Sequence, residues 1–242
     1  MMKPPRVRLV HWHRVWASVL LAICPSPAWA SVGSAIEGKV TIVDQDGKAV
    51  SHHGGVVIFL DQLEHPAGFS APTTHAVIRQ HDKRFDPAIL PIVMGTTVDF
   101  PNDDTIFHNI FSLSKNKPFD LGIYAQGTSR SVTFDQPGLV KIYCNIHPQM
   151  VAYILVLANP YFATTDQAGY FLLPNAPLGG ATVRSWYAQT REPPEQKIVV
   201  TAQGIQDLNL QLVESLRLEI REETISLQQH KNKWGEDYPA KY

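Results

Sequence analysis

The sequence predicts an all-β protein that is larger than one β-sandwich. No long window repeats apolar residues with a helical period, whereas short alternating runs recur between turn signals. The chain has 242 residues. Without an N-terminal export signal about 210 would remain, which is more than one compact domain of roughly 100–150 residues usually needs. We therefore expect two β-sandwich units, or one unit with a large extension.

Residues 1–30 are typical of a secretory signal peptide. They contain four basic residues and no acidic one, namely Lys3, Arg6, Arg8 and Arg14. An apolar run at 15–24 and the small-residue motif Ala28-Trp29-Ala30 follow, as expected before a cleavage site. The run is shorter than the roughly 20 residues that cross a bilayer. We therefore expect cleavage after Ala30, no membrane span in the mature chain, and a periplasmic or secreted location.

Removal of residues 1–30 would change both the net charge and the number of cysteines of the chain. The whole chain has 21 basic and 22 acidic residues, so loss of four basic ones leaves a mildly acidic protein. That balance argues against a nucleic-acid partner. Of the two cysteines, Cys24 leaves with the signal, so Cys144 has no partner for an internal disulfide. A lone thiol in an oxidising compartment needs burial or a bound metal.

The first strands are expected in residues 31–63. Residues 36–43 alternate as a half-buried strand, residues 44–47 offer a turn, and residues 56–60 form an apolar run suited to a buried strand. His52 and His53 lie in a polar loop with no third ligand at motif spacing, and are interpreted as solvated.

The middle of the chain, 64–158, begins with a loop rich in proline and glycine and continues as strands. Residues 76–80 and 89–93 are expected strands, separated by a polar turn at 82–84. Further on, Val140, Ile142 and Cys144 share parity, so a strand there would aim all three at the interior.

Three sulfur or imidazole donors follow that strand within one short loop. Cys144, His147 and Met150 have the spacing C-x2-H-x2-M. A thiolate, an imidazole and a weak thioether are the mixture that a blue-copper centre uses, and it lacks only a second imidazole. The thioether favours copper over zinc. The alternative is a buried cysteine with a gap-filling methionine in the core.

The region 76–158 resembles the cupredoxins, the blue-copper family that includes amicyanin, plastocyanin and pseudoazurin. The motifs are Phe85-x-Pro87, Gly95-Thr96-Thr97-Val98-x-Phe100-x-Asn102, His108-Asn109 and the Cys144/His147/Met150 loop. The resemblance implies a cupredoxin-like Greek-key sandwich with one Cu(I)/Cu(II) ion per chain. Its metal ligands would be His108, Cys144, His147 and Met150. Asn109 would tie the His108 strand to the Cys144 loop, and His147 would be the electron port.

Residues 159–213 resemble the transthyretin-like or carboxypeptidase-regulatory-like sandwich. The cues are the hairpin Thr165-Asp166-x-x-Gly169-x-Phe171 and a later strand that holds Trp186. The resemblance implies a second sandwich built from 31–63 and 159–213, with 64–158 inserted into it or docked on it. Residues 214–242 would form a C-terminal extension. The whole order is similar to bacterial periplasmic proteins of the methylamine-utilisation type.

Two functions remain open on this reading. The first is a periplasmic mononuclear type 1 (blue) copper protein that passes single electrons between redox partners through small, transient contacts. The second is a copper-holding or protein- or carbohydrate-binding β-module with no electron-transfer role. No acid–base carboxylate pair or serine nucleophile motif stands out, so we expect no enzymatic activity. Asp103 and Asp104 are expected to shape the turn before His108 rather than to act chemically.

Overall fold

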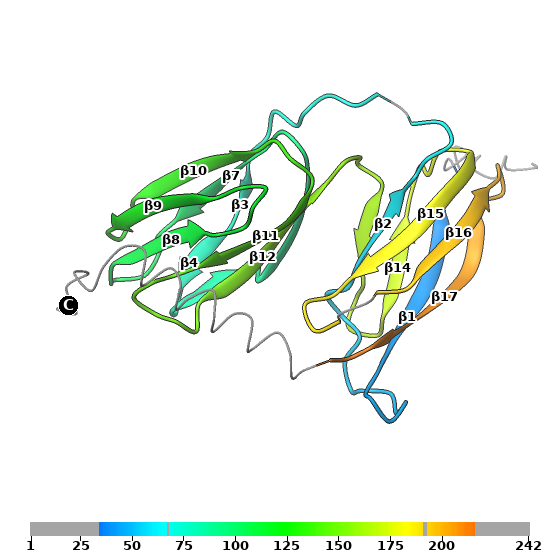
Figure 1. Ribbon diagram of the computed structural model, residues 1–242, viewed down its shortest axis with the longest axis horizontal. Helices are drawn as coiled ribbons and strands as arrows, with labels where there is room; N and C mark the ends of the chain where they lie inside the picture. The colour runs from blue at the N-terminus through cyan, green and yellow to red at the C-terminus, as the bar shows by residue number, and fades with distance from the viewer. Residues whose placement is uncertain (1–33, 67, 191–192, 216–242) are drawn as a thin grey trace, which may run out of the picture. The chain divides into compact units, whose positions relative to one another are not determined.

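The computed structural model describes residues 34–66, 68–190 and 193–215. These residues form 17 strands and no helix, which confirms the all-β prediction (Figure 1). The predicted signal peptide and most of the predicted C-terminal extension lie outside the described residues. No helix in the described part of the chain has the length and apolarity that crossing a membrane requires.

Two segments that are far apart in the chain make one β-sandwich, which we call the terminal sandwich. Its strands are β1 (Ile36–Val43), β2 (Val57–Asp61), β13 (Phe162–Thr164), β14 (Tyr170–Leu173), β15 (Gly179–Trp186), β16 (Glu195–Val200) and β17 (Ile205–Val213). One sheet has the order β14-β1-β17 and the other β13-β2-β15-β16. Their facing sides bury one apolar cluster that includes Val40, Ile58, Val183 and Leu212.

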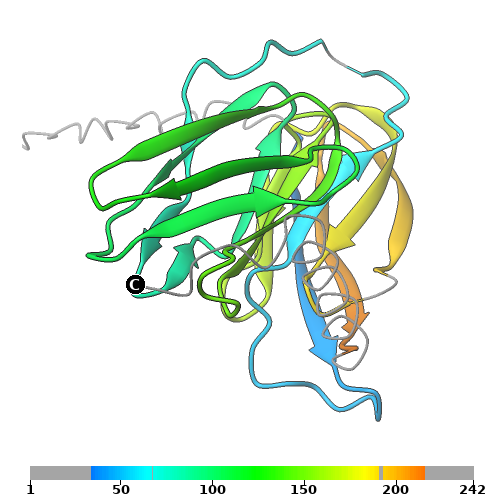
Figure 2. The same ribbon diagram turned by 60° about the vertical axis from the view of Figure 1, so that its left-hand side comes forward.

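The long-range contact that closes this sandwich is the parallel pairing of β1 with β17. It runs from Ile36↔Ile205 to Val43↔Val213 and is irregular between Ile36 and Gly38 (Figure 2). A Cβ atom on Gly38 would lie 2.1 Å from the carbonyl oxygen of Leu208. Glycine is therefore required at this close approach of the two backbones. Leu208, Leu210 and Leu212 are buried, as the alternation in this strand predicts.

The segment between these strands makes the second β-sandwich, the central sandwich. Its strands are β3 (Ala76–Val77), β4 (Arg79–His81), β5 (Arg84–Asp86), β6 (Ile89–Val93), β7 (Thr96–Pro101), β8 (His108–Ser112), β9 (Phe119–Tyr124), β10 (Ser129–Phe134), β11 (Gly138–Tyr143) and β12 (Val151–Leu157). The sheets have the orders β10-β7-β3 and β6-β12-β11-β8-β9, with β4 and β5 as a separate hairpin. The buried cluster between the sheets includes Val98, Phe100, Phe134 and Ile154.

Alternation along β11 decides where the Cys144 side chain lies. Val140 and Ile142 are fully buried, and Cys144, directly after the strand, is 1% exposed and belongs to the same cluster. The prediction that these three side chains face the interior is confirmed. β11 pairs antiparallel with β12 from Gly138↔Val156 to Tyr143↔Val151, so the loop 144–150 connects two neighbouring strands. On its other side β11 pairs with β8, the strand that begins at His108.

Candidate metal centre

Three donor atoms from two parts of the central sandwich meet beside the end of β11. Cys144 Sγ lies 3.8 Å from His108 Nδ1 and 4.0 Å from His147 Nδ1, and the two Nδ1 atoms are 3.1 Å apart. His108 is fully buried and Cys144 nearly so, whereas His147 is partly exposed. Two nitrogen lone pairs at 3.1 Å repel each other unless a proton or a cation lies between them.

These separations fit one metal ion of a particular geometry. The point equidistant from the three atoms is about 2.1 Å from each, which matches the roughly 2.0–2.3 Å bonds that imidazole and thiolate make to divalent first-row metals. One ion could therefore be held by His108, Cys144 and His147 together. A trigonal His2Cys set with a weak axial thioether is the arrangement of blue copper, whereas structural zinc is tetrahedral. The donor set therefore fits copper.

Met150 lies in the same loop and in the same buried cluster as Cys144. It is 1% exposed, its N–H donates to the carbonyl oxygen of His147 at 2.9 Å, and its own carbonyl accepts from the Cys144 N–H at 3.3 Å. These two hydrogen bonds hold the loop in a compact turn. The turn keeps Met150 in the same buried cluster as Cys144, where water is excluded.

The ring of His108 is held by a carboxylate. His108 Nε2 donates to Asp104 Oδ2 at 2.6 Å, and this bond leaves the lone pair on Nδ1, the atom that faces Cys144. Burial alone would raise the pKa of Asp104. Hydrogen bonds from the Lys83 N–H, the His108 ring and the Asp82 N–H outweigh that effect and lower the pKa of Asp104 below its usual value. Asp104 is therefore held as an anion.

A buried asparagine connects the two segments that supply the donors. Asn109 Oδ1 accepts a hydrogen bond from the Asn145 N–H at 2.8 Å, and Asn109 is fully buried. The hydrogen bond joins β8 to the residue that follows Cys144, in agreement with the role that the cupredoxin resemblance implies for Asn109. A hydrogen bond at this position limits movement of the thiolate relative to His108.

A second asparagine shapes the turn that precedes His108. Asn102 is fully buried, accepts from the Asp104 N–H at 3.0 Å, and donates to the carbonyl oxygens of Ile106 at 2.9 Å and Tyr124 at 3.1 Å. Every polar atom of this side chain therefore supports a loop that would otherwise be irregular. These bonds hold the loop in one conformation and thereby fix the separation between Asp104 and His108.

His147 is the donor that reaches the surface. Desolvation by partial burial is the main cause that lowers the pKa of His147 below its usual value, and electrostatic interactions with His108 and Lys83 act in the same direction. The ring of His147 is 4.8 Å from the ring of His108, centroid to centroid, at an interplanar angle of 62°.

The lowered pKa of His147 predicts a pH dependence of the metal-free protein. The unfolded chain takes up a proton on this imidazole near pH 6.5, whereas the folded chain resists it, so the free energy of unfolding falls as pH drops below that value. Urea denaturation at pH 7.5 and pH 5.5 measures the loss. A His147→Gln variant should lose less stability than the parent over this interval, and an equal loss in both would contradict the assignment.

The contact between Asp104 and His108 goes beyond the turn-shaping role that the sequence predicts for Asp104. No sequence signal distinguishes Asp104 from its neighbour Asp103. The interpretation of His52 and His53 as solvated fits His52, which is exposed, but not His53, which is partly buried. His53 Nδ1 accepts from the Ile42 N–H at 3.0 Å, and His52 Nε2 is 3.0 Å from the Tyr187 hydroxyl, so both rings support the fold of the terminal sandwich.

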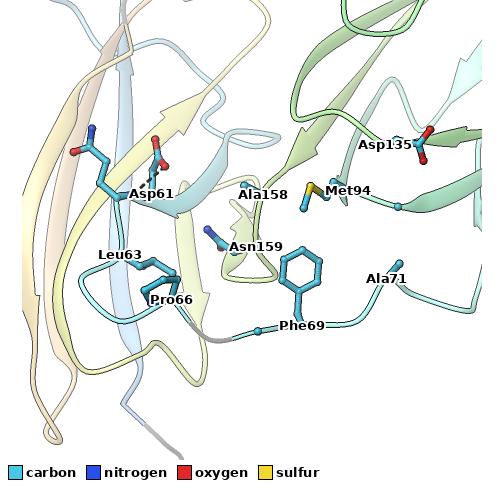
Figure 3. Close-up of a pocket in the computed structure, with 12 residues that line it drawn as sticks. Asp61, Leu63, Pro66, Phe69, Ala71, Met94, Asp135, Ala158 and Asn159 are labelled. Carbon is cyan, nitrogen blue, oxygen red and sulfur yellow. Dashed lines mark hydrogen bonds between the residues drawn. The ribbon is translucent and has the colours of Figure 1, made fainter.

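Other parts of the described chain offer no comparable set of donors. His108, Cys144 and His147 form the only cluster of three metal-ligating side chains found among the described residues. A separate pocket of about 640 Å³ is lined mainly by the linker after β2, with Leu63 and Phe69, and by Met94 and Asn159 (Figure 3). None of its lining residues belongs to the metal centre.

Comparison with known proteins found similarity only among solved structures. No protein-family profile and no curated protein matches the chain. A purple cupredoxin from Nitrosopumilus maritimus is 30% identical, with 34% of this chain and 99% of that chain covered and a TM-score of 0.32. A reduced tryptophan-to-tyrosine mutant of amicyanin is 19% identical, with 36% and 86% covered and a TM-score of 0.34.

The copper-containing nitrite reductase from Thermus scotoductus SA-01 is also similar. It is 26% identical with a TM-score of 0.35, and the match covers 40% of this chain but only 26% of the reductase. These similarities extend over about a third of the chain.

Proposed function

We propose that this chain is a periplasmic or secreted mononuclear type 1 (blue) copper protein that transfers single electrons between redox partners. The observation that carries the proposal is the triangle of Cys144 Sγ and the Nδ1 atoms of His108 and His147, because its dimensions suit one trigonal metal. The sequence of the loop adds a thioether and no carboxylate, which favours copper over zinc or magnesium.

In this proposal His108, Cys144 and His147 hold one copper ion per chain, and Met150 is its weak axial ligand. The bound ion supplies one-electron exchange between Cu(II) and Cu(I). The protein keeps the donors in one arrangement for both oxidation states, so little movement accompanies the exchange. The burial of Cys144 and Met150 and the hydrogen bond of Asn109 support this role.

His147 is the proposed electron port. It is the partly exposed donor, and the residues that precede the two histidines in sequence are exposed apolar side chains, Phe107 at 44% and Ile146 at 39%. A small apolar rim around an exposed ligand suits brief contact with a partner protein. Weak redox interfaces usually bury less than about 1,200 Å². We propose redox proteins as the partners and no nucleic acid.

The domain division also remains a proposal. Residues 1–30 would be removed as a signal peptide, 31–63 and 159–213 would form the terminal sandwich, 64–158 would form the copper domain, and 214–242 would extend the chain. The pairing of β1 with β14 and β17, and of β2 with β13 and β15, supports the discontinuous sandwich. We propose that the protein is an electron carrier rather than an enzyme.

The proposal is tested by the visible spectrum of the copper-loaded protein. We expect an intense thiolate-to-Cu(II) charge-transfer band, one copper per chain, and complete, reversible bleaching by one electron per copper. Metal analysis and a spectroelectrochemical titration measure all three. A colourless copper complex, or one without a reversible one-electron wave, would favour the copper-holding or binding module instead.

A further inference from the structure

The turn of the β4–β5 hairpin presents two backbone N–H groups to one carboxylate. Asp82 and Lys83 form this two-residue turn, and both have positive φ, 51° and 55°. Positive φ at both central residues is the geometry of a type I′ turn, which is unusual for lysine. The Asp82 N–H donates to Asp104 Oδ1 at 2.7 Å and the Lys83 N–H donates to Asp104 Oδ2 at 2.9 Å.

The same carboxylate holds the imidazole of His108. Asp104 Oδ2 accepts from His108 Nε2 at 2.6 Å while it also accepts from the Lys83 N–H. The side chain of Asp104 is 14% exposed and that of His108 is 0% exposed, so water competes little for these bonds. One anion therefore satisfies three donors, two from the hairpin and one from a candidate metal ligand.

The neighbouring aspartate provides a contrast within the same turn. Asp103 Oδ2 forms an ion pair with Arg79 Nη1 at 2.9 Å, and both side chains are about half exposed, at 42% and 55%. No contact between Asp103 and His108 is found among the described hydrogen bonds and ion pairs. Both aspartates lie in the turn and both bind the β4–β5 hairpin, Asp103 through Arg79 and Asp104 through the turn amides. Of the two, Asp104 is the one that contacts the His108 imidazole.

We propose that Asp104 is a positioning residue through which the β4–β5 hairpin sets the orientation and basicity of His108 and thereby the relative affinity of the site for Cu(II) and Cu(I). The proposal rests on the proposed copper function. A carboxylate that accepts the Nε2 proton makes Nδ1 more basic, and the more highly charged Cu(II) ion gains more from this than Cu(I) does. The hairpin amides keep the carboxylate in place.

The copper-dependent test compares Asp104→Asn with Asp103→Asn. Asparagine keeps the size of the side chain but has one acceptor oxygen in place of two and no charge. We expect Asp104→Asn to keep the charge-transfer band and to lose 10- to 100-fold in Cu(II) affinity. A tenfold loss for Cu(II) relative to Cu(I) raises a one-electron potential by about 59 mV. Asp103→Asn should leave both quantities unchanged, and equal shifts in the two variants would overturn the proposal.

A second measurement needs no copper, and its main readout is taken on the parent protein. In the metal-free parent protein at a pH where His108 is neutral, nitrogen-15 NMR of the imidazoles should show His108 with its proton on Nε2, protected from solvent exchange. A proton on Nδ1, or rapid exchange at Nε2, would overturn the proposal. Asp104→Ala should abolish the protection and Asp103→Ala should retain it.

The two measurements separate failure of this inference from failure of the proposed function. A parent protein without a charge-transfer band would refute the copper function, while the NMR result would still decide whether Asp104 holds His108. A blue parent protein with identical Asp104→Asn and Asp103→Asn potentials would refute the positioning role alone.

Discussion

Replacing Cys144 with serine is expected to abolish the visible band of the copper-loaded protein completely. The band arises from a thiolate bonded to Cu(II), and a hydroxyl oxygen does not provide the soft, easily oxidised donor that produces it. Cys144 Sγ also lies 3.8 Å from His108 Nδ1 and 4.0 Å from His147 Nδ1. Loss of this sulfur would leave only the two imidazoles of the triangle to bind the ion. Absorption spectra at equal copper loading measure the effect.

The matched control for this change is Ile146→Ser. Ile146 lies in the same loop, is 39% exposed and offers no metal ligand, so serine there should preserve the band. A thermal scan adds an independent readout. Copper at 1,000 times its dissociation constant stabilises the folded state by about 4.1 kcal/mol, and Cys144→Ser should lose most of this stabilisation. Survival of the band in Cys144→Ser would refute the copper assignment.

Replacing Phe100 with alanine is expected to cause a large loss of stability in the central sandwich. The side chain is fully buried, and its ring centroid lies 6.4 Å from that of Phe119. Removal of a buried phenylalanine ring costs about 3–5 kcal/mol, because the cavity closes only in part. Urea denaturation of the metal-free protein measures the change in the free energy of unfolding.

Phe107→Ala is the matched control for the same substitution. Phe107 is 44% exposed, and substitutions at exposed positions usually stay within about 0.5 kcal/mol. Phe107 also belongs to the apolar rim proposed around His147, so Phe107→Ala should slow electron exchange with a partner while it leaves stability almost unchanged. Similar destabilisation by the two substitutions would contradict the assignment of Phe100 to the core.

Much of the fold could be predicted because alternation is a local property. The period of two in β11 and β17 predicts the burial of Val140, Ile142 and Leu210, since successive side chains of a strand point to opposite faces. The short loop after β11 likewise brings Cys144, His147 and Met150 close together once its two strands pair. These features depend on residues a few positions apart, so they can be predicted from the sequence without the tertiary structure.

The partners of individual polar side chains could not be predicted in this way. His53 accepts a hydrogen bond from Ile42 of β1, and Asp104 receives two from the turn of the β4–β5 hairpin. Each contact joins segments whose relative position depends on strand register. A shift of one residue in the turn would exchange the roles of Asp103 and Asp104, and neither composition nor spacing reveals which of the two faces His108.

By itself the amino-acid sequence determined the β-class of the protein, the inward face of each long strand and the identity of the soft donors, because these follow from periodicity and side-chain chemistry over short distances. Only the tertiary structure decided that the two imidazole Nδ1 atoms lie 3.1 Å apart, that Asp104 rather than Asp103 holds His108, and that β1 pairs in parallel with β17. The physical reason is that sheet register and the packing of the core set distances between residues that the chain separates widely.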